Sequence, residues 1–454
     1  MVIFWLASLV IIAIALAVLA HLAAVGASYK AKVLCSTLFV SERKLDTQYS
    51  AEISAESYRI LRPITARVDY QRREVTCSLL GFAVKRTAAY RPGLGATLLT
   101  DASRTSLLPS ALLTSCVPTT TSAPWPEGVA ASPSTDGRLA RVLDTAFTEP
   151  DRRKPRRTRA IVIVKNGHIL AERYAPGFAP GMPMCGWSMS KSVLHALVGI
   201  AVSKGWLSTD KKDLLPKWRT DARADIRIED LLRMQSGLAF SEVYANPFSD
   251  VNRMLWIAPS TTAYAAAKPL RHAPGRYWSY ASGTSNILGR VVRNAVEHAG
   301  EDWASFPSRA LFTPLGMSSA ILEPDTTGDF VFSSFLQASP RDWARFGLLY
   351  ANDGCWDGKR LLPEGWVAHA MRPASQAPDA CYGAHWWLKL PNAMGGTLDA
   401  AKRIPGDAFH ALGHEGQALT VIPSLDLVIL RMGLSIIVDA WNHAAFLSNV
   451  LDTV

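Results

Sequence analysis

No Lys, Arg, Asp or Glu occurs before Lys30 in this 454-residue chain. The stretch from Val2 to Ala24 is almost wholly apolar, which is long enough to span a membrane and too long for the core of a typical signal peptide. An apolar N-terminus of this length is rarely the buried helix of a soluble protein. We therefore expect residues 1–28 to be a transmembrane anchor or an uncleaved leader. Val25-Gly26-Ala27 also fits a small-residue cleavage site, so removal of the segment is an open alternative.

Cysteine is sparse, and its spacing shows no Cys-x-x-Cys pair, which argues against a zinc site. Buried free thiols and one or two disulfides both fit six cysteines. Cys185 lies three residues before Ser188, and we interpret it as a packing residue rather than a second nucleophile. No internal repeat is evident. The cysteines are Cys35, Cys77, Cys116, Cys185, Cys355 and Cys381.

Charged residues make up only 19% of the chain against 49% hydrophobic ones, so a sizeable core can form. The formal net charge is +10, which favours acidic surfaces such as membranes, whereas nucleic-acid binding needs a focused basic patch. The one dense basic run, Arg152 to Arg157, stands just before a predicted strand and is typical of a solvated linker. We expect membrane contact through the N-terminal segment and no nucleic-acid partner, and nothing in the sequence indicates the oligomeric state.

Composition divides the rest of the chain into two parts. Residues 29–125 form an uncharacterised N-terminal region in which strands are plausible between Glu74 and Tyr90. The stretch from Thr114 to Pro133 is rich in Thr, Ser and Pro and indicates a linker or a wrapped surface segment. Residues 126–454 form the main domain.

The pattern of the main domain predicts sheet at both ends of its sequence and helices between them. Asn166-Gly167 is a strong hairpin signal between two of the strands. The order predicts an α/β (α+β) fold, in which terminal helices cover one antiparallel sheet and a second, helical lobe forms an active-site cleft with it. The predicted strands are 160–164, 168–174, 409–414, 417–422 and 427–432, and the terminal helices are 138–147 and 439–451.

Ser188-Met189-Ser190-Lys191 is the stretch with the clearest chemical meaning. Positions i and i+3 share one face of a helix, so the hydroxyl of Ser188 and the amine of Lys191 can meet. A neutral lysine can then take the proton from the serine and make it a nucleophile. Two other Ser-x-x-Lys matches lie in polar, charge-rich sequence, whereas Ser188 stands at the start of an apolar helical pattern. The plainer interpretation is that Ser188 only caps that helix, since serine is a preferred cap.

Two further motifs carry groups that can move or hold protons. Tyr280 and Ser282 are two residues apart, so an extended segment would point both side chains the same way, and a phenol can donate and accept a proton. His414 lies between Gly413 and Gly416 near the end of one predicted strand and the start of another, where a backbone can approach a ligand closely. A core tyrosine and a structural histidine are the alternatives.

These three motifs, in this order and spacing, resemble those of the penicillin-recognising serine hydrolases: class C β-lactamases, D-alanyl-D-alanine peptidases and related esterases. The resemblance covers about residue 126 to the end, with supporting matches at Asp230–Leu238 and Val421-Ile422-Pro423. It is closest to the branch of 6-aminohexanoate-dimer hydrolases and carboxylesterases. It implies a β-lactamase/transpeptidase-like fold and a serine hydrolase that cleaves small amides or esters.

On this resemblance, Ser188 attacks the substrate carbonyl, unprotonated Lys191 takes the proton, and Tyr280 passes it to the leaving group. The site must lower the lysine pKa from about 10.4 by roughly three units. The expected oxyanion donors are the backbone N–H groups of Ser188 and Gln417. The mechanism needs no metal or organic cofactor. Supporting or substrate-binding roles are expected for Ser282, Tyr244, His414, Gly416 and Trp386. Simple packing is the alternative for Tyr244, and a place in the core is the favoured alternative for Trp386.

One departure from the family pattern bears on the substrate. β-Lactamases usually carry Lys-Thr-Gly as the third motif, whereas this chain has His414, which is mostly neutral near pH 7. Binding of a β-lactam carboxylate is thereby less favoured than binding of small amides and esters. A β-lactamase or D,D-peptidase acting on peptidoglycan peptides is the first alternative. A non-catalytic ligand sensor on the same fold is the second.

The side of the membrane is a separate question. The resemblance implies a bacterial inner-membrane protein whose catalytic domain faces the periplasm. The basic flank Lys30 and Lys32 follows the span and by itself favours a cytoplasmic domain. We expect the periplasmic side, with the cytoplasmic side as the alternative.

Overall fold

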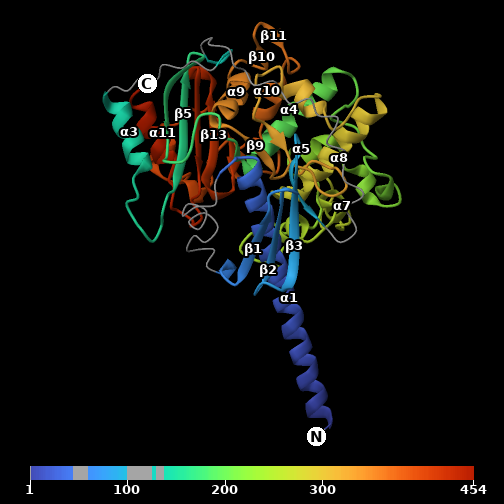
Figure 1. The fold of residues 1–454 in the computed structure, drawn as a ribbon. Coiled ribbons are helices and arrows are strands. Elements are labelled where there is room, and N and C mark those ends of the chain that lie inside the picture. Colours follow the sequence, from blue (N-terminus) through green and yellow to red (C-terminus); the bar gives the residue numbers. More distant parts are fainter. Residues whose placement is uncertain (1, 44–59, 100–124, 129–136) are drawn as a thin grey trace.

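A five-stranded antiparallel sheet with the order β12-β13-β14-β5-β6 lies at the centre of residues 137–454 (Figure 1). This computed structural model describes residues 2–43, 60–99, 125–128 and 137–454. Strand β14 pairs with β5, with Val428 opposite Val164, so the two ends of the main domain share one sheet, as predicted. The hairpin between β5 and β6 turns at Asn166 and Gly167, which have φ of 50° and 78°. The strands are β5 (Thr158–Lys165), β6 (His168–Tyr174), β12 (Phe409–Gly413), β13 (Gln417–Ile422) and β14 (Leu427–Gly433).

Side chains alternate across this sheet and enter two separate cores. Ile161 and Ile163 point to the face covered by α3 (Gly137–Phe147) and α11 (His443–Leu451). Val162 and Val164 point to the opposite face, which packs against α9 (Pro340–Ala351) and the main core. The last helix starts later than predicted from Asp439. Asp439 has a φ of 64°, and the Asn442 side chain caps the helix by accepting a hydrogen bond from Ala445 N at 2.9 Å.

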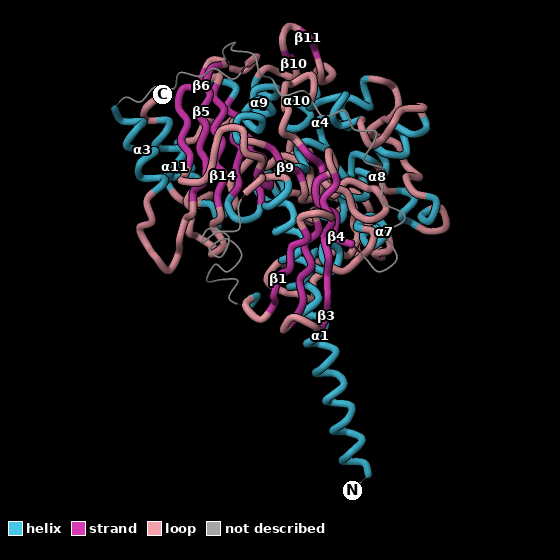
Figure 2. Tube along the Cα trace, in the orientation of Figure 1, coloured by secondary structure: helices cyan, strands magenta, loops and turns pink. Residues whose placement is uncertain are grey.

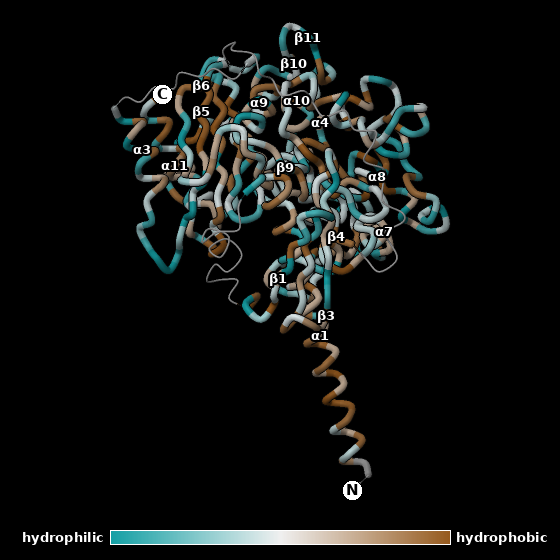
Figure 3. Tube along the Cα trace, viewed as in Figure 1, coloured by the Kyte–Doolittle hydropathy of each residue, from teal (hydrophilic) through white to brown (hydrophobic). Residues whose placement is uncertain are grey.

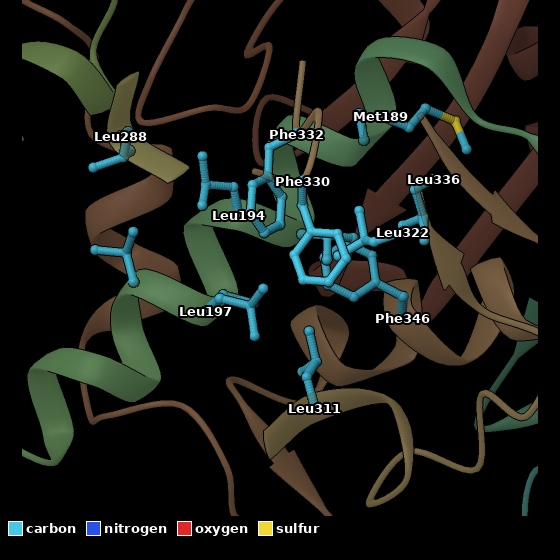
Figure 4. Close-up of a cluster of buried hydrophobic side chains, with 14 of the residues drawn as sticks. Met189, Leu194, Leu197, Leu288, Leu311, Leu322, Phe330, Phe332, Leu336 and Phe346 are labelled. Carbon is cyan, nitrogen blue, oxygen red and sulfur yellow. The ribbon is translucent and has the colours of Figure 1, made fainter. Parts of the chain in front are cut away.

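The second lobe is helical, as predicted, and shares its core with the sheet. Leu194 and Leu197 of helix α4 lie in this core together with Leu288, Phe332 and Phe346 (Figure 4). Its helices are α4 (Ser190–Ser203), α5 (Ile228–Leu232), α6 (Asp250–Trp256), α7 (Thr261–Ala266) and α8 (Ser282–His298). Smaller elements complete the body: β7 (Met184–Cys185), β8 (Ile321–Leu322), β9 (Leu336–Ala338), β10 (Cys355–Trp356), β11 (Lys359–Arg360) and α10 (Trp366–Met371).

A small module precedes the main domain, built from the second half of helix α1 (Val2–Phe39) and a four-stranded antiparallel meander (Figure 2). Ala27, Ala31 and Leu34 of α1 are fully buried against Val75 and Ala88 of the meander. We call residues 23–39 together with these strands the N-terminal module. The strands are β1 (Ile64–Asp69), β2 (Glu74–Leu79), β3 (Ala83–Arg91) and β4 (Gly95–Leu99).

The first half of α1 projects from the body as an exposed apolar helix (Figure 3). Residues 4–20 are exposed and span roughly 26 Å at about 1.5 Å per residue, close to the roughly 30 Å hydrocarbon thickness of a bilayer. Length and composition fit a single membrane span or a signal sequence. The helix runs without a break from this half into the N-terminal module, past residue 28.

A buried ion pair joins the N-terminal module to the main domain. Lys32 of α1 pairs with Glu323, and their side chains are 4% and 0% exposed. The same carboxylate accepts hydrogen bonds from Ser36 Oγ at 2.8 Å and from Ala96 N at 2.8 Å. Helix and meander therefore both bind one acidic side chain of the main domain, which fixes the module against it.

The expected linker lies largely outside the described residues, as does Cys116. The described part of the linker, residues 125–128, packs on α9. There Trp125 is buried and Arg345 donates hydrogen bonds to Pro126 O and Gly128 O, both at 2.9 Å. The other five cysteines are free thiols. Among them, Cys185 packs in β7 with its Sγ directed at Ser334 O.

Candidate active site

Ser188 lies in a tight 3₁₀ turn, Trp187–Met189, directly before α4. Trp187 adopts a φ of 49°, a conformation that costs free energy in a non-glycine residue and that persists only where its surroundings hold it. Here the indole Nε1 of Trp187 donates to Glu415 Oε2 at 3.1 Å. The turn presents Ser188 partly exposed while Met189 and Ser190 are buried.

Lys191 is 1% exposed and lies on the first turn of α4 with its Nζ 2.7 Å from Ser188 Oγ. The Nζ is also 3.2 Å from Ser282 Oγ and 2.9 Å from the Ser333 carbonyl oxygen. Burial lowers the pKa of Lys191 to about 8, against the opposing pull of the Glu242 carboxylate. At pH 7 roughly a tenth of the amine is therefore uncharged, and the share reaches about half near pH 8.

Glu242 is a further acidic group at this cluster. Its Oε1 accepts a hydrogen bond from Ser282 Oγ at 2.5 Å, and its Oε2 accepts one from Ser282 N at 2.8 Å. Burial raises the pKa of Glu242, while the neighbouring Lys191 and the bonds to Ser282 oppose that rise. Ser188, Lys191, Ser282 and Glu242 thus form one continuous hydrogen-bonded chain of polar groups.

Tyr280 covers this cluster from the segment before α8. Its ring lies over Lys191, with the ring centroid 4.9 Å from Nζ. Burial and the Glu242 charge raise the pKa of Tyr280, so the phenol keeps its proton at neutral pH. Trp387 packs on the ring at 5.3 Å between centroids and holds it in place.

His414 and Tyr244 form an aromatic wall beside the serine. Their rings stack with centroids 4.6 Å apart, and His414 meets Trp187 edge-on at 5.4 Å. Burial lowers the pKa of His414, which the Glu415 charge partly offsets, so the imidazole is neutral at pH 7. Both residues of this aromatic wall, His414 and Tyr244, are therefore uncharged.

Gly416 and Gln417 close the turn between β12 and β13. Gly416 has a φ of 83°, and a Cβ there would lie 2.6 Å from Arg431 Nη1, so the turn requires glycine. Gln417 begins β13, and its side chain bonds the backbone of Gly433 through Nε2 at 2.7 Å and Oε1 at 2.8 Å. Gly413 approaches Gly186 so closely that a Cβ on it would lie 2.2 Å from Gly186 O. This contact sets the β12–β13 turn against the turn that carries Ser188.

A family model described as Beta-lactamase matches residues 143–433 of this chain. The chain belongs to the beta-lactamase family. A 6-aminohexanoate-dimer hydrolase from Paenarthrobacter ureafaciens is 23% identical over 298 residues, which cover 61% of this chain and 72% of that protein. Among solved structures, a Bacillus anthracis protein whose name places it with the 6-aminohexanoate-dimer hydrolases superposes with a TM-score of 0.56 at 22% identity, over 69% of this chain and 80% of that one. A family VIII carboxylesterase gives 0.52 at 15% identity, over 70% and 96%.

This beta-lactamase-family serine hydrolase has the fold that the resemblance implied, an antiparallel sheet with terminal helices and a helical lobe. The structure brings Ser188, Lys191, Tyr280 and Ser282 to one point between the lobes. Tyr244 and His414 lie beside them. Within the described ranges, no group of three or more His, Cys, Asp or Glu side chains could hold a metal ion.

One residue expected at the pocket wall lies elsewhere. Trp386 is 0% exposed and packs with Tyr350 and Phe409 in the main core, so it is a core residue, as the alternative had it, and not part of the wall. Trp387 forms isolated β-bridges with Tyr382 and His410, whereas Trp386 lies in the bend before it. The neighbour Trp387 is consequently the one that reaches Tyr280.

Sequence reasoning missed Glu242 as a member of the cluster. The residue lies two positions before Tyr244, in a loop that follows α5 with no regular periodicity. The only signal was an acidic side chain in an otherwise weakly charged stretch beside a substrate-contact candidate. Such a side chain is more often solvated, and only the folded loop shows that its carboxylate turns inward to Ser282.

Proposed function

We propose that this protein hydrolyses small amides or esters through an acyl-enzyme on Ser188. The observation that carries the proposal is the 2.7 Å separation between Ser188 Oγ and Lys191 Nζ, with the amine buried and its pKa lowered to about 8. A nucleophile that is partly exposed, next to a base that is desolvated, is the arrangement that acyl transfer requires. The site contains a nucleophile, a base and a proton donor. A non-catalytic ligand sensor would not require all three, so their presence together argues against that alternative.

In the first step Ser188 Oγ forms a bond to the substrate carbonyl carbon while its proton moves to Lys191 Nζ. The carbonyl π electrons move to oxygen, and the backbone N–H groups of Ser188 and Gln417 are the proposed donors to that oxyanion, worth roughly 3–4 kcal/mol each. Tyr280 then gives its proton to the leaving amine or alkoxide as the carbon–heteroatom bond breaks, and Lys191 returns the proton to Tyr280. Water, deprotonated by the same pair, hydrolyses the acyl-enzyme and restores Ser188.

His414 and Tyr244 support an uncharged substrate in the pocket beside Ser188. A neutral imidazole stacked on a phenol offers no positive charge for the carboxylate of a β-lactam or of a peptide terminus. The similarity to a 6-aminohexanoate-dimer hydrolase supports amide substrates, and the fold shared with a family VIII carboxylesterase agrees with esters. Rapid turnover of nitrocefin or of a D-Ala-D-Ala peptide would favour the β-lactamase or D,D-peptidase alternative instead.

Covalent labelling with a fluorophosphonate probe tests the nucleophile directly. We expect the wild-type protein to be labelled and Ser188→Ala to lose all labelling, because the probe reacts only with an activated hydroxyl. Ser208→Ala is the matched control, since Ser208 is exposed and also stands three residues before a lysine. Equal labelling of Ser188→Ala and wild type, read by in-gel fluorescence, would remove Ser188 from the nucleophilic role.

The pH dependence of an ester substrate tests Lys191 and Glu242 together. Since the base must be uncharged, kcat/KM should rise with pH and level off above a midpoint near pH 8. The Glu242 carboxylate raises the pKa of Lys191, so Glu242→Gln should move that midpoint to lower pH. A midpoint that stays in place or moves upward in Glu242→Gln would contradict the electrostatic link between the two residues.

We further propose that α1 is a retained membrane anchor and that residues 126–454 are the catalytic domain. Cleavage near Ala27 would cut a helix whose residues Ala23, Ala27 and Ala31 are packed against the rest of the protein. The lysines that suggested a cytoplasmic domain are structural, since Lys30 Nζ donates to Ile64 O at 2.6 Å and Lys32 pairs with Glu323. Their weight as a topology signal is therefore small, which leaves the periplasmic side as the proposed location.

A further inference from the structure

A cavity of about 470 Å³ lies between helix α1, the meander and the candidate active site. Its volume falls in the range of about 300–1,000 Å³ that is usual for small-molecule pockets. It is formed only because the N-terminal module sits against the main domain, so neither part has this cavity alone. The described residues that line it are Leu19, Leu22, Ala23, Val25, Gly26, Tyr29, Ile60, Leu61, Pro63, Ile64, Leu79, Trp187, Tyr244, Ala245, Pro247, Asn252, Trp256 and His414.

The described lining contains no Lys, Arg, Asp or Glu side chain and is largely aliphatic and aromatic. The amide of Asn252 is engaged internally, because its Nδ2 donates to Tyr244 O and Asn246 O, both at 2.9 Å, and its Oδ1 accepts from Trp256 Nε1 at 3.2 Å. Apart from the phenols of Tyr29 and Tyr244 and the imidazole of His414, the described lining has few groups that could replace the hydration of a charged or strongly polar ligand. The chemistry of the wall therefore selects a hydrocarbon chain.

The lining joins two places that matter for a membrane enzyme. Trp187 and Tyr244 both pack on His414 beside Ser188, so one end of the lining includes the aromatic wall described above. Leu19 and Leu22 lie where α1 changes from an exposed apolar helix to a packed one, with Leu19 53% exposed. If α1 spans the bilayer, this second group lies at the membrane surface, as the projecting helix suggests (Figure 3).

We propose that the cavity holds the acyl chain of a membrane-borne ester or amide whose carbonyl lies at Ser188. The inference rests on the proposed acyl transfer and specifies its substrate class as an amphiphile with a single hydrocarbon chain. The chain leaves the bilayer beside Leu19 and Leu22 and enters the cavity without crossing water. The polar leaving group remains on the open side of the cleft, where Ser188 is partly exposed.

Hydrolysis of p-nitrophenyl esters from acetate to dodecanoate by the full-length protein in phosphatidylcholine vesicles tests this proposal. We expect kcat/KM to rise with acyl length, by up to roughly fourfold per methylene while the cavity fills, and then to level off. Val25→Trp places an indole in the cavity and should reduce dodecanoate hydrolysis to the level of acetate, with acetate hydrolysis unchanged. Val10→Trp is the matched control, since Val10 is on the exposed half of the same helix, and it should behave as wild type.

A length profile that is flat in the wild type, or equal losses of acetate and dodecanoate hydrolysis in Val25→Trp, would overturn the acyl-chain site. Failure to hydrolyse any ester, together with no fluorophosphonate labelling, would instead overturn the proposed function. In that case the acyl-chain site can still be tested by binding alone. An alkyl-diazirine ester is photo-crosslinked to the Ser188→Ala protein, and the crosslinked residues are mapped by mass spectrometry. Crosslinks at residues 22–26 and 60–64 that Val25→Trp abolishes support the site, and crosslinks confined to residues 4–20 overturn it.

Discussion

Replacing Lys191 with methionine should lower kcat/KM for an ester by roughly 10²–10⁴-fold. The methionine keeps the volume and burial of the lysine stem but removes the only amine that lies 2.7 Å from Ser188 Oγ within the described residues. Without a base, the hydroxyl stays protonated and attacks slowly. The measurement is kcat/KM at pH 8, with active-site labelling as a second readout.

Lys191→Arg separates a base from a mere positive charge, because a guanidinium stays protonated at all accessible pH values. We expect it to be as inactive as Lys191→Met, and substantial activity in Lys191→Arg would contradict the role of Lys191 as the base.

Thermal unfolding of Lys191→Met supplies an independent check on the same group. The pKa of Lys191 falls from about 10.4 in the unfolded chain to about 8 in the folded protein. Below pH 8 the lysine is charged in both states, so the folded protein bears the full cost of a buried charge. Between these pKa values the unfolded state binds more protons, and wild-type stability rises with pH. Lys191→Met should therefore be the more stable protein at pH 7, and its advantage should shrink as the pH rises from 8 to about 10.4.

Lys32→Met should destabilise the folded protein by about 3–5 kcal/mol, since it leaves the buried carboxylate of Glu323 without its counter-charge. Loss of this pair should loosen the N-terminal module first, because Glu323 also accepts from Ser36 and Ala96. The free energy of unfolding in detergent, measured by denaturant titration, checks the size of the effect. Limited proteolysis within residues 60–99 checks its location.

Two controls distinguish a buried charge from the loss of any ion pair. In the double variant Lys32→Met/Glu323→Gln no net charge stays buried, so most of the lost stability should return. Lys212→Met breaks the pair with Asp225, whose side chains are 54% and 67% exposed, and should cost less than about 1 kcal/mol. Equal costs for Lys32→Met and Lys212→Met would contradict the account of Glu323 as a buried anchor.

Much of the main domain was predictable because local patterns and tertiary structure agree there. The hairpin at Asn166-Gly167 and the helix after Ser188 follow from residues within a few positions of one another. The approach of Ser188, Tyr280 and His414 was inferred through a family resemblance, since no local rule brings together residues that are far apart in sequence. Contacts of Glu242 with Ser282 depend on an irregular loop, whose path is determined by tertiary packing rather than by periodicity.

The N-terminal module was harder to predict for a different reason. Ala27, Ala31 and Leu34 belong to a helix that is apolar on nearly all sides, so hydrophobicity alone does not show where the exposed half ends and the packed half begins. The strands alternate only in places, because parts of both faces of the small meander are covered, so that neighbours such as Ala88 and Ala89 in β3 are both buried. Lys30, the first charged residue of the chain, lies well inside the packed half of α1.

The unbroken course of α1 has a consequence for how sequence changes would be tolerated. A single residue inserted among positions 23–39 would turn everything before it by about 100° relative to the meander, and the alanines that face Val75 and Ala88 would lose their partners. The same insertion among positions 4–18 would change only length, because that half is apolar around its whole circumference. The outer half thus depends on its length and hydrophobicity, and the inner half on its helical phase.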